Sequence, residues 1–185
     1  MKEPGQYLAQ VLKERRKAKG WSLDQASRHT GVSKAMLGQI ERGESSPTVA
    51  TLWKIATGFD AALSDFLEQP ALEAQSSVRQ AGEFRHQPAV DEMLVAPIFP
   101  YDEALGFEMF ELTLMPGYTR SSEPHARGVV EHVVLVRGEM ELLIEGEWKP
   151  LQEGDAVRFA ADRPHGYRNL GREPAVFHNL IHYPS

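Results

Sequence analysis

The sequence predicts a multidomain chain in which an α-helical bundle is followed by an all-β domain. Up to about residue 68, apolar side chains recur at the three- and four-residue spacing of amphipathic helices. From residue 107 onward, short apolar runs lie between glycine-containing turns about 8–12 residues apart, which is typical of a sandwich or small barrel. The polar segment between these parts is rich in Gln, Ser and Pro, as linkers are. We therefore expect a helical domain at 5–68, a linker at 69–90 and a β domain at 91–185.

The composition excludes several classes of protein. The chain has 185 residues and no cysteine, so it forms no disulfide, no cysteine zinc site and no thiol nucleophile. Its apolar runs are too short to span a membrane, and its N-terminus lacks the apolar core of a signal peptide. We therefore expect a cytoplasmic protein that does not contact a membrane.

The charge of the chain is unevenly distributed. A net charge of −6 argues against a protein that coats nucleic acid indiscriminately. Residues 1–42, however, contain nine Lys or Arg and four Asp or Glu, a balance of +5, whereas residues 71–185 contain ten and eighteen, a balance of −8. A basic part on an acidic body indicates that one part contacts phosphate while the other does something else.

Five short helices are expected in the first part. Ser22 followed three residues later by Gln25 is a capping-box pattern, and Ser33 is a good N-cap for the third helix. Gly58 is expected to end the fourth helix, and Ser64 to cap the fifth. The expected helices are residues 5–19, 22–30, 33–43, 48–58 and 63–67.

The third of these helices presents a face that suits a DNA groove. Met36, Leu37 and Ile40 fall on one side, which can be buried. An exposed set on the other faces is small, polar or cationic and free of carboxylates: Lys34, Ala35, Gly38, Gln39 and Arg42. Small residues permit close approach, an amide can contact base edges, and cations can contact phosphates. With the short turn at Gly31 before it, the segment has a helix-turn-helix pattern, the alternative being an ordinary amphipathic surface helix.

The run GWSLDQASRHTGVSKAMLGQIERGESSPTVATLWKIATGF resembles the Cro/C1-type, or XRE, family of helix-turn-helix domains, which would cover residues 8–67. The resemblance implies that the third helix lies in the major groove and that Lys34, Ala35 and Gln39 read bases. It also implies a structural ion pair between Arg16 and Glu41. The candidate DNA-binding residues are Ser22, Gln25, Ser33, Lys34, Ala35, Gln39, Arg42, Ser46 and Thr48.

One position departs from the pattern of this family. Many members carry Gln directly after the cap of the second helix, where it contacts phosphate, whereas this chain has Leu23. Backbone amides at that helix start, together with Ser22 or Gln25, can take over the phosphate contact.

The second part is predicted to contain six strands, at residues 107–114, 129–136, 140–144, 148–151, 156–159 and 175–182. Over about residues 107–182 it resembles the small single-barrel cupins, which implies a small antiparallel β-barrel or jelly roll. Residues 116–138 match the first cupin motif, and residues 154–169 match the second.

The cupin resemblance implies a candidate metal or effector pocket. In metal-binding cupins, two His and one Glu of the first motif and one His of the second bind a divalent cation. His125, Glu131 and His165 fall on three of these places, and Glu123 occupies the place of the first His. Such nitrogen and oxygen ligands suit zinc above all, and also manganese, iron or nickel. The alternative is a cupin that has lost its metal and keeps these groups as pocket polarity, and the residues leave both possibilities open.

An XRE domain followed by a cupin resembles a class of one-component bacterial transcription regulators, and most of the chain is similar to enterobacterial regulators of sulfur utilisation. This implies sequence-specific binding to double-stranded DNA, a small-molecule effector and control of genes for acquiring sulfur compounds. Because one small basic module binds DNA weakly, we expect a homodimer, joined through the cupin, that reads an inverted-repeat operator. The alternative function is a cupin metalloenzyme, similar to a thiol dioxygenase, that carries a DNA-binding domain. Glu123 in place of a His weighs against that enzyme.

Overall fold

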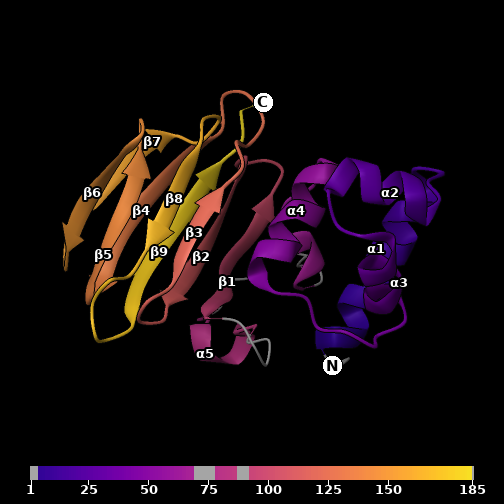
Figure 1. Ribbon diagram of the computed structural model, residues 1–185, viewed down its shortest axis with the longest axis horizontal. Helices are drawn as coiled ribbons and strands as arrows, with labels where there is room; N and C mark the ends of the chain where they lie inside the picture. Colours follow the sequence, from indigo (N-terminus) through magenta and orange to yellow (C-terminus); the bar gives the residue numbers. More distant parts are fainter. Residues whose placement is uncertain (1–3, 69–77, 87–91, 185) are drawn as a thin grey trace. The chain divides into compact units, whose positions relative to one another are not determined.

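The computed structural model describes residues 4–68, 78–86 and 92–184, which belong to two compact units (Figure 1). Residues 4–68 form a helical unit, and residues 78–86 and 92–184 form a unit made mostly of strands. The predicted succession of a helical part and an all-β part is thus confirmed. No helix among these described residues combines the length and apolar character that crossing a bilayer requires.

The helical unit contains the five helical segments that the sequence predicts. In chain order they are α1 (Pro4–Ala18), α2 (Leu23–Thr30), α3 (Lys34–Glu41), α4 (Val49–Phe59) and the 3-10 turn η1 (Ser64–Phe66). The last segment differs from the prediction, because it is a single 3-10 turn whose N-cap is Leu63, with no side-chain cap. Ser64 lies inside the turn and is buried.

Side-chain caps define where the predicted helices begin. Ser22 and Gln25 form the full capping box of α2: the Ser22 hydroxyl accepts from the Gln25 amide at 3.2 Å, and the Gln25 side chain accepts from the Ser22 amide at 2.8 Å. At α3 the Ser33 hydroxyl accepts from the Met36 amide, and at α4 the Thr48 hydroxyl accepts from the Thr51 amide, without the reciprocal bond of a capping box. Gly43 follows the C-cap of α3 with φ +70, a left-handed conformation that glycine adopts without steric cost.

Gly58 does not end α4, contrary to the prediction from its residue type. The helix runs on to Phe59, and Asp60 is the left-handed C-cap. Gly58 is where the backbones of α2 and α4 come close, since a Cβ there would lie 2.6 Å from the Cα of Thr30 and 2.7 Å from the carbonyl oxygen of His29. Glycine at this position therefore serves helix packing.

The core of the helical unit consists of apolar side chains from its helical segments. The fully buried members include Leu12, Leu37, Ile40, Leu52, Ile55, Phe59, Leu63 and Phe66. Polar contacts join η1 to α1. Arg15 donates to the carboxylate of Asp65 at 2.8 Å, and the Tyr7 hydroxyl donates to the backbone carbonyl oxygen of Asp65. The helices thereby hold α3 in a fixed place while its outer face stays exposed.

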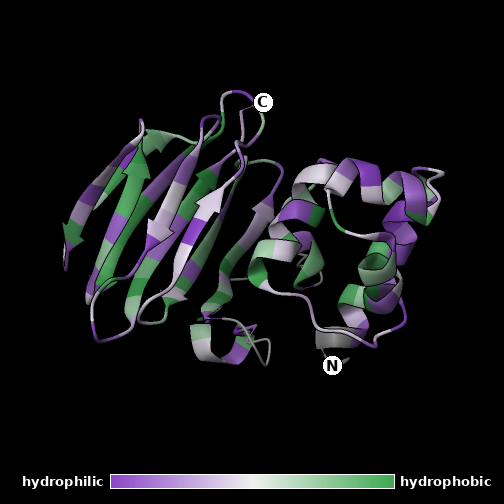
Figure 2. Cartoon of the chain, in the orientation of Figure 1, coloured by the Kyte–Doolittle hydropathy of each residue, from purple (hydrophilic) through white to green (hydrophobic). Residues whose placement is uncertain are grey.

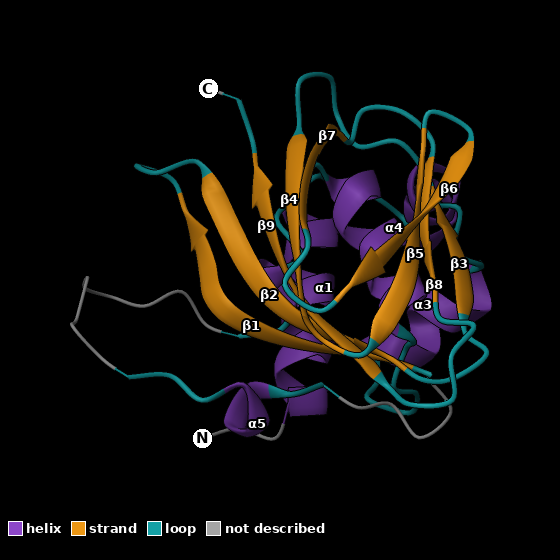
Figure 3. Cartoon of the chain, turned by 90° about the vertical axis from the view of Figure 1, so that its left-hand side faces the viewer, coloured by secondary structure: helices purple, strands orange, loops and turns teal. Residues whose placement is uncertain are grey.

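The second unit is built from nine strands, all paired antiparallel, among the described residues. They are β1 (Met93–Asp102), β2 (Phe107–Leu114), β3 (Thr119–Ser122), β4 (Val130–Arg137), β5 (Glu139–Ile144), β6 (Glu147–Gln152), β7 (Ala156–Ala160), β8 (His165–Arg168) and β9 (Ala175–His182). One sheet has the order β1-β2-β9-β4-β7 and the other the order β3-β8-β5-β6. The two sheets face one another (Figure 3).

Hydrophobic and hydrophilic residues are interspersed along these strands (Figure 2), and burial alternates along several of them. On β4, Glu131, Val133 and Leu135 are buried, whereas Val134 and Val136 are exposed. The interior between the sheets is otherwise mostly apolar and includes Phe110, Leu112, Leu142, Tyr167 and Phe177. A carboxylate on β4 is therefore directed into an apolar interior, where it needs partners.

All six predicted strands are present, and three further strands escaped the sequence prediction. β1 contains Pro97 and Pro100, and proline lacks the N–H that an inner strand must donate. β1 is indeed the outermost strand of its sheet, and its pairing with β2 shifts register between Pro97 and Phe99. β3 and β8 have only four residues each, too few for a clear alternating pattern.

Part of the predicted linker packs on the second unit, while residues 69–77 and 87–90 lie outside the described residues. Residues 78–86 include the short helix α5 (Ala81–Phe84), and His86 forms an isolated bridge with Val95 of β1. Arg79 donates to the carbonyl oxygen of Pro97 at 3.3 Å and lies over the ring of Phe84. This half of the predicted linker thus has a defined place beside β1.

Candidate functional site

The outer face of α3 carries the residues that the sequence singles out for DNA. Lys34, Ala35, Gln39 and Arg42 are all exposed, and Leu37 and Ile40 are buried beneath them. Gly38 was expected on the exposed side but is buried, because the Leu23 and Arg42 side chains cover it. The exposed set remains small, polar and cationic, as an approach to DNA requires.

Both cations on this face are paired with carboxylates. The Lys34 ammonium lies 2.8 Å from Asp24, and the Arg42 guanidinium makes two bonds of 2.7 Å to Glu44. The hydrogen bond to Glu44 raises the pKa of Arg42, and the same bond lowers the pKa of Glu44. All four groups are exposed, so the cations can exchange these partners for phosphate at little cost.

The capping residues among the DNA-binding candidates lie at the starts of helices. The Ser22, Ser33 and Thr48 hydroxyls accept backbone N–H bonds, and the hydroxyl hydrogens of Ser22 and Ser33 remain to be donated. The Thr48 hydroxyl also shares a hydrogen bond of 2.9 Å with the Thr51 hydroxyl. Gln25 accepts through its oxygen, which leaves its amide N–H groups as donors. Ser46 is exposed in the loop before α4. Donors at helix starts suit phosphate contacts, and these roles remain predictions.

The ion pair between Arg16 and Glu41 is confirmed. The Arg16 Nε lies 2.5 Å from Glu41 Oε1, and its Nη2 lies 2.8 Å from Oε2. Glu41 is at the end of α3 and Arg16 is near the end of α1, so the pair fixes the reading helix to the first helix. It is structural, and neither side chain is directed outward.

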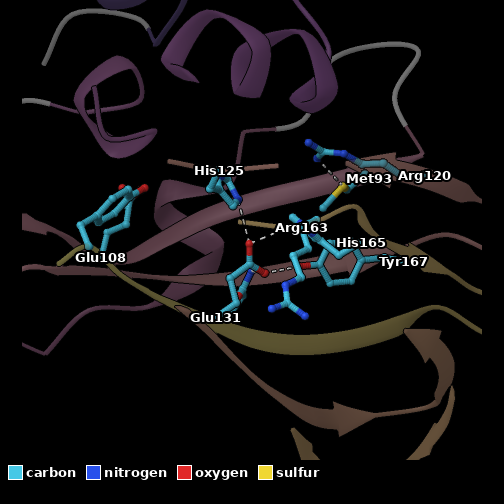
Figure 4. A network of polar contacts seen from close by, with 10 residues as sticks. Met93, Glu108, Arg120, His125, Glu131, Arg163, His165 and Tyr167 are labelled. Carbon is cyan, nitrogen blue, oxygen red and sulfur yellow. Dashed lines mark hydrogen bonds and ion pairs between the residues drawn. The ribbon is translucent and has the colours of Figure 1, made fainter. Parts of the chain in front are cut away.

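The candidate metal centre is a cluster between the two sheets, formed by His125, Glu131 and His165 (Figure 4). One ligand atom from each lies within 4.8 Å of the others. Glu131 Oε1 is the common point, 2.9 Å from His125 Nε2 and 3.5 Å from His165 Nε2. The residues come from the loop after β3, from β4 and from β8, which the facing of the sheets brings together.

The other oxygen of Glu131 is held by two residues that the sequence did not place in the site. Glu131 Oε2 accepts from the Tyr167 hydroxyl and, at 2.9 Å, from Asn179 Nδ2. Burial alone would raise the pKa of Glu131, but its hydrogen bonds to His125 and His165 hold this pKa well below its usual range. The carboxylate is therefore ionised, with Oε1 turned to the histidines and Oε2 fixed from behind.

The orientation of His165 is set by its second nitrogen. Nδ1 donates to the carbonyl oxygen of Arg163 at 2.9 Å, which leaves Nε2 directed at Glu131. Burial lowers the pKa of His165, but the bonds to Glu131 outweigh burial and raise it. A backbone carbonyl on Nδ1 is the arrangement that prepares Nε2 of a neutral histidine to ligate a metal.

These residues fit a divalent cation. Two imidazole Nε2 atoms and one carboxylate oxygen converge, which is a donor set that zinc and related metals accept. The fit is supported by Asn179, which is 1% exposed and whose Oδ1 has no hydrogen-bond partner among the described residues. Because Glu131 can only accept, Nδ2 must face it, and Oδ1 is left to accept from a bound water or ligand.

Glu123, the fourth candidate of this pocket, is not in the cluster. It is exposed and follows the last residue of β3, and its side chain does not join the three converging ligands among the described residues. Tyr167, by contrast, belongs to the site, because its hydroxyl donates to Glu131. The alternating burial of β9 is the signal that finds Asn179, since Phe177, Asn179 and Ile181 all face inward.

Known protein families match both units. Residues 12–66 match the helix-turn-helix family, and residues 110–181 match the cupin domain family. The chain is 48% identical over 184 residues to the HTH-type transcriptional regulator SutR of Escherichia coli strain K12, and the match covers 100% of this chain and 99% of that protein.

Solved structures similar to the chain include two bacterial transcription regulators or parts of them. An HTH_3 family transcriptional regulator from Vibrio cholerae is 42% identical, with a TM-score of 0.80 and 98% of each chain covered. The Cupin_2 domain of an XRE family transcriptional regulator from Enterobacter cloacae is 51% identical over 51% of this chain and 99% of that one, with a TM-score of 0.50. The chain belongs to the family of HTH-type transcriptional regulators in which a helix-turn-helix domain precedes a cupin domain.

Proposed function

We propose that the chain regulates transcription by reading an operator in double-stranded DNA with α3. The observation that carries this is the exposed face of Lys34, Ala35, Gln39 and Arg42 on a helix whose other side is locked into the core. The test is selection of DNA from a random-sequence pool by the purified protein, followed by footprinting. We expect one enriched sequence, protected in the major groove. Enrichment of no sequence over the starting pool would contradict the proposal.

The active form is a homodimer that reads an inverted repeat. Its basis is that a helical unit with a balance of only +5 in its first 42 residues gains few phosphate contacts alone. Two reading helices about one helical turn, roughly 34 Å, apart would contact two half-sites. The cupin unit joins the protomers, and its two sheets make up the small barrel of that family. Sedimentation at micromolar protein should give a dimer and the footprint two half-sites, whereas a monomer on one half-site would contradict this.

The cupin interior is the sensor of a small molecule, with a divalent cation, zinc first, held by His125, Glu131 and His165. The cation would supply a Lewis-acidic anchor for an effector, while Tyr167 and Asn179 orient Glu131 from behind. Oδ1 of Asn179 has no hydrogen-bond partner among the described residues, which favours an effector or water that donates a hydrogen bond to it. The effector changes DNA binding only by the difference between its affinities for the DNA-binding and non-binding arrangements of the dimer.

The sensor is tested with His165→Ala and, as a matched control, His178→Ala. His178 is on the same domain, half-exposed, 3.9 Å from Glu111 and outside the cluster. After incubation with zinc and dialysis, we expect bound metal in the wild type and the control and none in His165→Ala. Candidate effectors should change the operator affinity of the wild type and the control but not that of His165→Ala. Without an effector, all three proteins should bind the operator with the same affinity. An equal metal content and an equal response in all three proteins would contradict the sensor.

The regulated genes are those for acquiring sulfur compounds, which rests on the resemblance to regulators of sulfur utilisation alone. The protein acts in the cytoplasm, where the DNA is, and it binds its effector without turning it over. Mass analysis of candidate effectors after incubation with the metal-loaded protein tests this last point. Conversion of any of them would favour the cupin metalloenzyme.

A further inference from the structure

The reading face of the helical unit is hollowed at its centre. A shallow depression of about 350 Å³ lies between the start of α2 and the outer side of α3. Its lining is Leu23, Lys34, Ala35, Gly38, Gln39 and Arg42. Three of these residues, Leu23, Ala35 and Gly38, are apolar, and we call them the floor. The other three carry polar ends, and we call them the rim. The depression therefore offers an apolar seat inside a polar, cationic surface.

Glycine keeps this depression open. A Cβ on Gly38 would lie 3.7 Å from Cδ1 of Leu23 and 3.1 Å from Nη1 of Arg42, so it would occupy the space above the floor. Gly38 lies inside α3 and adopts no left-handed backbone conformation, so the helix itself does not require glycine at this position. What glycine provides here is room next to Leu23.

The surroundings identify what the seat accepts. Lys34 and Arg42 beside it complement phosphate, and Gln39 offers an amide that can contact base edges. In the major groove, the one apolar group that a base pair presents is the C5-methyl of thymine. We propose that the floor of Leu23, Ala35 and Gly38 receives the C5-methyl of one thymine in each half-site and makes that thymine a specificity determinant. This rests on the proposed reading of DNA by α3.

The proposal gives Leu23 a role in place of a phosphate contact. Leu23 is the first residue of α2 and is only half-buried. Part of its apolar surface therefore faces water, and contact with another apolar group would be favourable. A thymine methyl seated on Leu23 supplies that contact when DNA is bound. Leu23 then acts on base choice, and the phosphate contact at this helix start falls to the backbone amides and to Gln25.

The experiment is a methyl scan of the selected operator with the full-length protein. Each thymine is replaced in turn by deoxyuridine, which removes only the methyl group and leaves every hydrogen-bonding group in place. We expect one position per half-site at which affinity falls about fourfold, the equivalent of one buried methyl group. Deoxy-5-bromouridine at that position, with a bromine of about methyl size, should restore the affinity.

Variants locate the seat. In Gly38→Ala and in Leu23→Ala, the ratio of the affinities for thymine and uracil at this position should fall towards one. Because the ratio is taken within each variant, any uniform effect on DNA binding cancels. Gly82→Ala is the matched control: Gly82 lies in α5 of the other unit with open space around it, and its ratio should equal that of the wild type. Alanine is the better helix former, so Gly38→Ala retains its fold, and thermal unfolding verifies this.

Three outcomes overturn the inference, and one of them reaches further. A selective operator with no methyl-sensitive thymine would overturn the inference alone. A ratio that Gly38→Ala and Leu23→Ala leave unchanged would place the methyl contact elsewhere. Absence of selective DNA binding would overturn the proposed function together with this inference.

Discussion

Arg16 of α1 and Glu41 of α3 form a two-point ion pair, and the same guanidinium donates through Nη1 to the carbonyl oxygen of Trp21 at 2.8 Å. The side chains are only 15% and 7% exposed. One arginine therefore joins the end of the first helix, the segment before α2 and the end of the reading helix. The position of α3 relative to α1 depends on this residue.

Replacement of Arg16 by alanine should lower the free energy of unfolding of the helical unit by about 3 kcal/mol, because it leaves the Glu41 charge largely buried without its partner. Arg15→Ala is the control: its pair with Asp65 is more exposed, with side chains 40% and 21% accessible, and its loss should cost about 1 kcal/mol or less. Urea unfolding followed by circular dichroism measures both. Equal losses would show that burial does not distinguish the two pairs.

Gln39→Ala should cost about 1–3 kcal/mol at the operator and relax base choice at one position in each half-site. The reason is that its amide can make two hydrogen bonds to a base edge, which alanine cannot. Arg42→Ala should instead weaken binding to all sequences alike and reduce the salt slope by about one. Affinities for every single-base variant of the operator, at two salt concentrations, separate these effects. An unchanged base preference in Gln39→Ala would remove that residue from the readout.

Glu44→Gln should strengthen DNA binding a few-fold, and Asp24→Asn should act in the same direction. Glu44 accepts hydrogen bonds from Nε and Nη2 of Arg42, and Asp24 accepts one from Lys34. Each cation must therefore leave a carboxylate before it contacts phosphate. The neutral amides remove that competition and a charge that repels DNA. Glu153→Gln, which removes the same charge from an exposed turn of the cupin unit, is the control and should change affinity less. A gain in Glu153→Gln as large as that in Glu44→Gln would assign the effect to net charge.

The cluster around Glu131 should make stability depend on pH in a defined window. The lowered pKa of Glu131 contributes stability that is present above its ordinary value of 4.5 and is lost as the pH falls through the folded value. The raised pKa of His165 contributes stability that is present below its ordinary value of 6.5 and is lost as the pH rises through the folded value. The stability difference between the wild type and Glu131→Gln should therefore be largest between pH 4.5 and 6.5.

Urea unfolding at a series of pH values, with a chelator present, measures this difference. The chelator matters because a bound cation would replace the hydrogen bonds between Glu131 and the histidines. Glu153→Gln serves again as the control, since an exposed carboxylate should give a difference that is small throughout this range. A difference for Glu131→Gln that is flat from pH 4.5 to 6.5 and beyond both limits would contradict the linkage.

The sequence by itself determined the secondary structure wherever a local rule applied. The strands at 107–114 and 175–182 have the bounds of β2 and β9, because alternation and turn residues are read within one segment. The caps at Ser22 and Ser33 were found for the same reason, since a cap bonds a backbone amide only three residues ahead. The family resemblance added the set of His125, Glu131 and His165, which the structure brings together.

Tertiary structure decided what depends on contacts between distant segments. The residue types do not predict that Gly58 lies inside α4. Glycine is needed there because the backbone of α2 packs against it, and that contact is between distant segments. Glu123 was expected in the pocket from its place in the motif, but it lies outside the cluster. Tyr167 contacts Glu131 instead, because the register of β8 against β3 and β5 decides which side chains of β8 enter the interior. Tyr167 and Asn179 lie 36 and 48 residues after Glu131 in the sequence. They contact it because β8 belongs to the sheet that faces β4 and β9 pairs with β4. Local patterning determines which face of a strand is buried, but only the packing of the sheets determines which buried groups become partners.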